Sequence, residues 1–124
     1  QGLQARVYNN IGEVKHYRGR CKEAKSYYEK ALEISIRAGN EIDQAVSLNN
    51  LGVLHHNYLS KLDEALNFHE KALEIRRRLG CRRVEGTSYT NIGGVYEARG
   101  DYEKALEYYE KSYVISLEVK DKVL

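Results

Sequence analysis

Several side chains in this sequence could take part in catalysis, but their spacing does not assemble a reactive group. His55 and His56 are adjacent, so on a helix their rings point to different sides and cannot share a metal ion. Ser60, Asp63 and His69 lack the context of a nucleophile elbow or a catalytic triad. There is also no glycine-rich phosphate loop. We therefore expect no enzyme activity, no metal and no cofactor.

The one cluster of like charge is IRRRLGCRR at residues 75–83, which contains Arg76, Arg77, Arg78, Arg82 and Arg83. It fits a solvated helix end, where cations oppose the negative end of the helix dipole. The alternative is a contact with phosphate or with an acidic peptide. The net charge of the chain is only +2, and charges of both signs are interspersed. This balance favours the helix end and predicts no nucleic-acid partner.

Composition limits the compartment and the completeness of the chain. No apolar run approaches the length of a membrane-spanning helix, so no membrane association is expected. Cys21 and Cys81 are too far apart for a zinc knuckle and too few for a disulfide framework, which indicates reduced thiols and a cytoplasmic location. The sequence of 124 residues contains no Met, so we expect a fragment of a longer protein.

The best candidates for recognition are asparagines in a segment that occurs three times: YNNIG at 8–12, LNNLG at 48–52 and YTNIG at 89–93. Asn10, Asn50 and Asn91 each lie two positions before a glycine, roughly 200° around a helix from it. A carboxamide can pair with both the N–H and the C=O of an extended peptide. The three could form a ladder along a groove, or they could hydrogen-bond a neighbouring helix or each other.

The elements that carry these asparagines repeat at a fixed period. A landmark Ala, preceded by Glu or Lys, follows each glycine 12 or 13 residues on, and in the first two units the next glycine comes 28 residues after that Ala. Such regularity is typical of stacked repeats. Apolar residues at spacings of three and four within each half of a unit predict two helices. The expected helices are 3–18, 21–38, 41–57, 61–79, 82–98 and 101–119.

Capping residues support these boundaries. Gly39 suits a left-handed position after a helix, and Asn40, Ser60 and Asp101 can cap the helices that follow them. Cys81 is a poorer cap. The mid-helix glycines Gly12, Gly52 and Gly93 are expected to face small residues of the partner helix, namely Ala24, Ala65 and Ala105, so that the two backbones approach closely.

The spacing resembles the tetratricopeptide repeat. The residues that carry the resemblance are Tyr8, Ile11, Gly12, Ala24, Tyr28 and Ala31 in the first unit; Leu48, Leu51, Gly52, Ala65, His69 and Ala72 in the second; and Tyr89, Ile92, Gly93, Tyr96, Ala105, Tyr109 and Ser112 in the third. The usual closing Pro is absent and each unit is at least six residues longer, which is similar to the repeats of Pins-type adaptors and kinesin light chains. His69 stands in an aromatic position.

The resemblance implies an all-α fold: a right-handed α-solenoid of three antiparallel helix pairs. We expect one domain, residues 1–124, with units at about 3–40, 41–80 and 81–120, belonging to a longer array. In this family the first helices line a concave groove. The implied peptide-binding residues are Asn9, Asn10, Glu13, His16, Tyr17, Asn49, Asn50, Val53, His56, Asn57, Thr90, Asn91 and Glu97.

The expected function is a non-catalytic scaffold that binds a protein or peptide segment. The carboxylate clamp that holds chaperone tails is not expected, because the matching positions offer Asn50 but no cation. The alternative is a structural spacer, or a regulatory repeat segment of a larger protein, with the ligand site elsewhere. The last helix should leave Tyr113, Ile115, Leu117 and Val119 incompletely covered, which predicts either end-to-end self-association or further repeats in the native chain.

Overall fold

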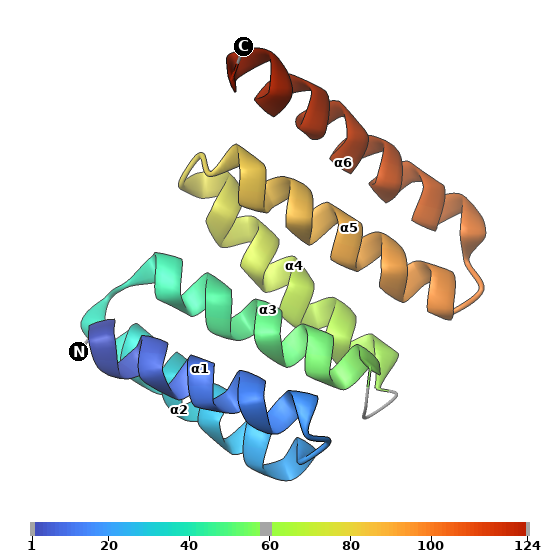
Figure 1. Cartoon of the computed structure of the whole chain (residues 1–124). Coiled ribbons are helices and arrows are strands. Elements are labelled where there is room, and N and C mark those ends of the chain that lie inside the picture. The colour runs from blue at the N-terminus through green and yellow to red at the C-terminus, as the bar shows by residue number, and fades with distance from the viewer. Residues whose placement is uncertain (1, 58–60, 124) are drawn as a thin grey trace.

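The computed structural model describes residues 2–57 and 61–123, and every regular element within them is an α-helix. The helices are α1 (Gly2–Tyr17), α2 (Cys21–Ala38), α3 (Glu41–Asn57), α4 (Leu62–Arg78), α5 (Arg82–Ala98) and α6 (Tyr102–Val123) (Figure 1). The predicted helices are confirmed, with most ends within one residue. Only α6 runs clearly further than expected, by four residues.

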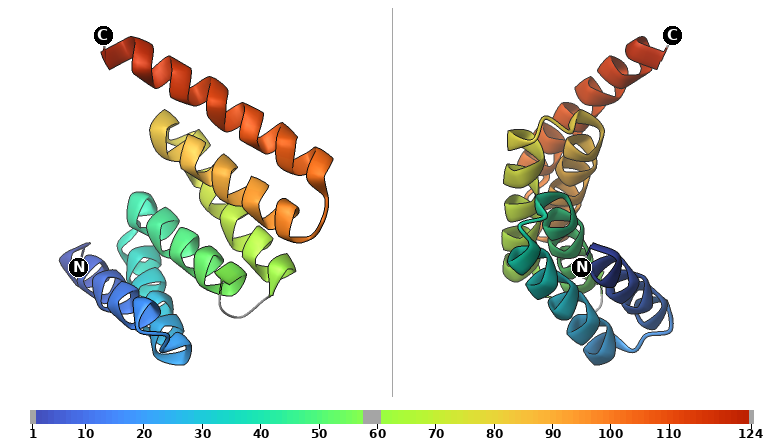
Figure 2. Two further views of the ribbon diagram at one scale, coloured as in Figure 1. Left: turned by 45° about the vertical axis from the view of Figure 1, so that its right-hand side comes forward. Right: turned by 90° about the vertical axis from the view of Figure 1, so that its left-hand side faces the viewer.

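The helices form three antiparallel pairs, α1–α2, α3–α4 and α5–α6, stacked in chain order as an α-solenoid. Each pair packs on the next through its second helix, and α1 also contacts α3 as α3 contacts α5. In the right-hand view of Figure 2 the stack is bent, with α4 on the outside of the bend and α1 and the end of α6 reaching toward the other side. The inner side of the bend is therefore built by the first helices of the units.

Three of the predicted capping residues are confirmed. Gly39 ends α2 in the left-handed conformation, at φ 67°, where a side chain would be strained. Asn40 Oδ1 accepts a hydrogen bond of 3.1 Å from the backbone N–H of Asp43, and Asp101 Oδ1 accepts one of 3.4 Å from Lys104. Cys81 precedes α5 without a side-chain cap bond, and the predicted cap Ser60 lies outside the described residues.

The mid-helix glycines face the partner helix, but the atoms nearest to them belong to rings and not, as expected, to small residues. Gly93 also lies close to Ala105 as expected, since an added Cβ would be 3.3 Å from its carbonyl oxygen. A Cβ atom added at Gly12 would lie 2.6 Å from a ring carbon of Tyr28, closer than any real contact. The same relation holds for Gly52 against His69 and for Gly93 against Tyr109. The glycine therefore makes room for a flat ring across the helix pair, and the dispersion contacts of that ring offset the low helix propensity of glycine.

The outer surface of α6 differs from the prediction in one residue. Ile115 is buried against Gly86, so α5 covers this side of the helix. Val119 is only partly buried, as expected. Tyr113 is 64% exposed, whereas Leu73, which precedes it by one repeat, is 8% exposed beneath α5. Among the described side chains of α6, the exposed large apolar ones are Tyr102, Leu106, Tyr113, Val114 and Leu117.

Candidate binding surface on the first helices

Asparagine side chains connect the first helices of successive units. Asn91 Nδ2 on α5 donates a hydrogen bond of 2.8 Å to Asn49 Oδ1 on α3, and Asn50 Nδ2 lies 3.5 Å from Asn9 Oδ1 on α1. Asn9 also exchanges hydrogen bonds of 3.1 and 3.2 Å with the hydroxyl of Ser47. Each asparagine two places before a glycine thus reaches the unit before it. Asn10 has no preceding unit here and is exposed.

Arg76 completes the polar junction between the second and third units. Only 7% of the residue is exposed, and its Nη1 lies 2.8 Å from Ser88 Oγ and 3.4 Å from Asn49 Oδ1. The expectation that the whole arginine cluster is solvated is therefore wrong for this member, because its guanidinium finds acceptors on α3 and α5. The one sign of these polar junctions in the sequence was that serines, Ser47 and Ser88, occupy equivalent positions in the second and third units.

A cavity of about 270 Å³ lies between the ends of α1 and α3. It is lined by Glu13, His16, Tyr17, Tyr28, Asn50, Val53 and Asn57. Six of these seven residues belong to the predicted peptide-binding set, and the seventh, Tyr28, is the ring that packs on Gly12. The structure therefore brings residues 13–17 of the first unit together with residues 50–57 of the second.

Burial controls the protonation of the cavity wall. His16 Nδ1 lies 3.1 Å from the hydroxyl oxygen of Tyr28. Burial lowers the pKa of His16 below its ordinary value, and the nearby Glu13 carboxylate opposes this effect without cancelling it. Burial also raises the pKa of Tyr28, with the charge of Glu13 adding to the shift. At neutral pH the wall is therefore a neutral imidazole beside a neutral phenol, and Glu13 carries the local charge.

The equivalent place between the second and third units has different chemistry. In the second unit His56 is equivalent to His16, and His69 is equivalent to Tyr28. Gly94 of the third unit lies next to His56, since a Cβ atom added to it would be 3.5 Å from the His56 ring. In the third unit the Tyr109 hydroxyl donates a hydrogen bond of 2.7 Å to Glu97. His69 is 1% exposed and neither of its ring nitrogens has a hydrogen-bond partner. Burial, helped by His56 and Arg76, lowers the pKa of His69 to about 4.

The thirteen predicted residues divide by accessibility. Asn10, Glu13, Tyr17, Asn57, Thr90 and Glu97 are exposed, while Asn49, Asn50, Val53, His56 and Asn91 are half-buried. Asn9 is 4% exposed and His16 is 8% exposed. The expectation of direct peptide contact is corrected for Asn9, whose amide is used between helices. His16 contributes only as a wall of the cavity.

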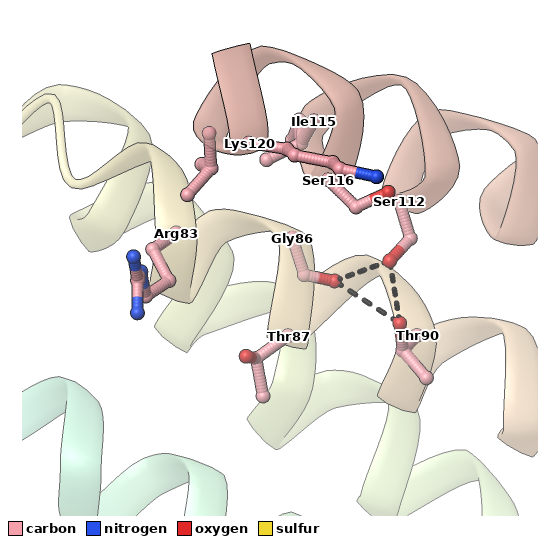
Figure 3. A pocket seen from close by; sticks show the side chains of 9 residues that line it. Arg83, Gly86, Thr87, Thr90, Ser112, Ile115, Ser116 and Lys120 are labelled. Carbon is pink, nitrogen blue, oxygen red and sulfur yellow. Dashed lines mark hydrogen bonds between the residues drawn. The ribbon is translucent and has the colours of Figure 1, made fainter. Parts of the chain in front are cut away.

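A larger cavity, of about 500 Å³, lies between α5 and the last turns of α6 (Figure 3). Ser112, Thr90 and the carbonyl oxygen of Gly86 are joined by hydrogen bonds of 2.6 to 3.2 Å, so these groups already satisfy one another. Thr90 and Ser116 line this cavity and are equivalent in the repeat to Asn49 and Arg76. In the preceding unit, Asn49 and Arg76 form hydrogen bonds with residues of α5. This cavity therefore corresponds to the surface on which one unit packs against the next.

Within the described residues, no group of three or more His, Cys, Asp or Glu side chains is placed to hold a metal ion. In the same part of the chain, none of the helices has the length and apolar character needed to cross a membrane.

His55 is buried and donates through Nδ1 to the carbonyl oxygen of Leu51 at 2.8 Å, which is a structural bond.

The family model of the tetratricopeptide repeat matches residues 3–78 and 54–118, and the chain belongs to this family. No curated protein matches the sequence. Among solved structures, BtubC (BKLC) from P. vanneervenii is similar over 94% of this chain and 48% of its own length, with 30% identity and a TM-score of 0.86.

Two more distant structures share the fold. The TPR domain of Arabidopsis FLU aligns with 94% of this chain and 97% of its own, at 22% identity and a TM-score of 0.81. A Podosopora anserina putative kinesin light chain with nearly identical TPR-like repeats aligns with 96% of this chain and 58% of its own, at 16% identity and a TM-score of 0.82. The chain spans about half the length of BtubC. The α-solenoid and the family are therefore established, and the family suggests protein–protein interaction.

Proposed function

We propose that this chain is a non-catalytic scaffold that binds an extended protein segment along α1, α3 and α5. The observation that carries the proposal is the cavity between α1 and α3, because its lining joins residues from two units on the side where a groove is expected. It lies beside Asn50, the middle member of the asparagine series. Single-groove affinity is expected to be micromolar, about 8 kcal/mol.

The asparagines retain the groups that a backbone needs. Asn50 and Asn91 each use one N–H on the preceding unit. Within the described part of the chain, neither side-chain oxygen accepts a hydrogen bond, so each amide keeps an acceptor and a second N–H. These are the two kinds of group required to pair with an extended backbone. Holding one amide in place also lowers the entropy cost of binding.

The place of the scaffold in the cell is part of the same proposal: a cytoplasmic protein with protein partners, no nucleic acid and no membrane. The alternative is a spacer or regulatory segment of a larger protein, with its ligand site elsewhere. This alternative assumes a longer native protein, and the chain spans about half the length of BtubC.

The two ends of the stack support a second kind of contact. Val7 and Val14 on α1 are exposed, whereas Ser88 and Val95, at the equivalent positions of α5, are fully buried by the unit before them. Tyr113 on α6 is exposed in the same way at the other end. We propose that a further repeat, or the opposite end of a second copy, covers these faces. A mass by light scattering that stays monomeric at high concentration contradicts stacking of copies.

Selection from a library of random displayed peptides tests the scaffold proposal. Gly94→Gln places a long side chain over the inner face, while Gly94→Ala adds only a methyl group at ordinary contact distance and is the matched control. Peptides selected on the unaltered chain should bind the Gly94→Ala variant equally and the Gly94→Gln variant at least about tenfold more weakly. Failure to select any peptide, or equal binding to both variants, contradicts the proposal.

A further inference from the structure

We infer that the cavity between α1 and α3 receives a basic side chain, that of Lys or Arg, from the bound segment. This inference rests on the proposed function, because it assumes that a segment lies along the first helices. It adds the charge of the residue that the segment must carry and the position where that residue is held.

Glu13 supplies the charge. Its carboxylate lines the cavity and is exposed, and among the described residues no cation lies within 4.0 Å of it. Two cations close to Glu13 in the sequence, Lys15 and Arg20, both pair with Glu23. The distances are 3.3 Å for Lys15 and 3.5 Å for Arg20. Those two cations are therefore engaged elsewhere, and Glu13 is left as an unneutralised charge in a partly enclosed space.

The helix ends add to this charge. The cavity is lined by Tyr17 and Asn57, the last residues of α1 and α3. The C-terminal end of a helix carries about half a negative elementary charge, although at the end of α1 the carbonyl oxygens of residues 14–16 accept backbone hydrogen bonds from residues 18–20. Two such ends beside one carboxylate attract a cation and repel an acidic side chain. The neutral His16–Tyr28 wall does not oppose them.

The shape of the site fits a long side chain with a charged tip. Tyr17 is 83% exposed and its ring stacks on His16, with centroids 5.9 Å apart. Together with Val53 it offers an apolar surface for an aliphatic stem. A cation above the exposed aromatic ring gains further attraction. A volume of about 270 Å³ accommodates one such side chain.

The next unit lacks this charge. The position of Glu13 is taken by Val53 in the second unit and by Gly94 in the third, and that of Tyr17 by Asn57 and Ala98. Glu97 is the nearest acidic group in the third unit, and it accepts the hydrogen bond of Tyr109. The preference for a basic residue is therefore confined to the first junction, which would fix the register of a bound segment.

A titration with N-acetyl-arginine methylamide, followed by two-dimensional NMR of the ¹⁵N-labelled chain, tests this site without any partner. We expect saturable shifts at the amides of Glu13, Tyr17 and Val53, weaker at high salt, and none with N-acetyl-glutamate methylamide. Glu13→Gln should weaken binding about fivefold. Glu29→Gln, the same change on an exposed position of α2, should leave it unaltered.

Two results overturn the inference: no saturable shift at these amides, or equal affinity in the Glu13→Gln variant. The outcome is independent of the peptide selection. If selected peptides bind and the arginine amide does not, the basic-residue site fails and the scaffold stands. If the arginine amide binds at Glu13 while no peptide is selected, the scaffold fails.

Discussion

The side-chain amide of Asn91 lies 2.8 Å from the side-chain oxygen of Asn49 and donates a hydrogen bond to it. This bond joins α5 to α3, and the longer Asn50–Asn9 contact repeats the relation between α3 and α1. One N–H of Asn50 and of Asn91 is therefore used between units. The proposed function assigns their remaining polar groups to a ligand, and the two roles can be separated by experiment.

Replacing the asparagines should separate these roles. Asn91→Ala removes a half-buried hydrogen bond and should lower the free energy of unfolding by about 1 kcal/mol. Asn10→Ala, on an exposed side chain, should change it by less than about 0.5 kcal/mol. Urea denaturation measures both. Both variants should weaken binding of selected peptides, whereas lost stability with unchanged binding would identify a spacer.

Two adjacent glycines should respond in opposite directions to the same substitution. In Gly93→Ala the new methyl group would lie 2.7 Å from the Tyr109 ring and 3.3 Å from the carbonyl oxygen of Ala105, so we expect a loss of about 1–2 kcal/mol. In Gly94→Ala the nearest atom is 3.5 Å away, and the higher helix propensity of alanine should add up to about 1 kcal/mol. Thermal unfolding of the two variants measures whether each change lowers or raises stability. If both changed stability in the same direction, the packing described here would be contradicted.

His69 should make the chain sensitive to acid. Its pKa in the folded chain is about 4, against an ordinary 6.5, so the unfolded chain binds the proton first as the pH falls. The free energy of unfolding is therefore not reduced by His69 protonation above pH 6.5, and it falls progressively as the pH is lowered toward 4. The loss should be about 3 kcal/mol. Burial of His16 acts in the same direction.

The variant His69→Tyr provides the control for this pH dependence. Tyr occupies the equivalent position in the first and third units, and it removes two buried nitrogens that have no partner. We expect higher stability at pH 7, by about 1 kcal/mol, and a flatter profile between pH 6.5 and 4. Chemical denaturation at a series of pH values measures both. An unchanged profile would show that His69 is not the titrating group.

Replacing Arg76 should lower the free energy of unfolding far more than replacing its neighbour Arg77. Arg76→Ala leaves the Ser88 hydroxyl without its buried donor, takes one of two donors from Asn49 Oδ1 and removes the packing of the stem, so a loss of about 2–3 kcal/mol is expected. Arg77→Ala, on an exposed side chain, should remain within about 0.5 kcal/mol. Equal effects in urea denaturation would mean that the Arg76 bonds contribute nothing to stability.

The fold was predictable from the sequence because local signals agree. The period of three and four, the Gly39–Asn40 boundary and the aromatic–glycine spacing all depend on residues close together in the chain. The partner of each mid-helix glycine was not predictable in the same way. Whether Gly12 meets Ala24 or Tyr28 depends on how two helices are rotated about their axes, which spacing alone does not specify.

The candidate site was predictable as a set of positions but not as contacts. Residues 13–17 and 50–57 were both expected on the inner face, and the structure joins them in one cavity. The burial of Asn9 and Arg76 depends on pairing across units, where a polar residue finds a partner about 40 or 12 positions away. A long cationic side chain at a helix end is ordinarily solvated, so the sequence gives no local sign of such burial.

The most direct test of the central claim is a two-dimensional NMR map of a selected peptide on the ¹⁵N-labelled chain. If the first helices form the binding surface, the largest shifts will fall on α1, α3 and α5, at Asn10, Glu13, Asn50, Val53 and Asn91. Shifts confined to the outer surfaces of α2, α4 and α6, with these five residues unaffected, would contradict it.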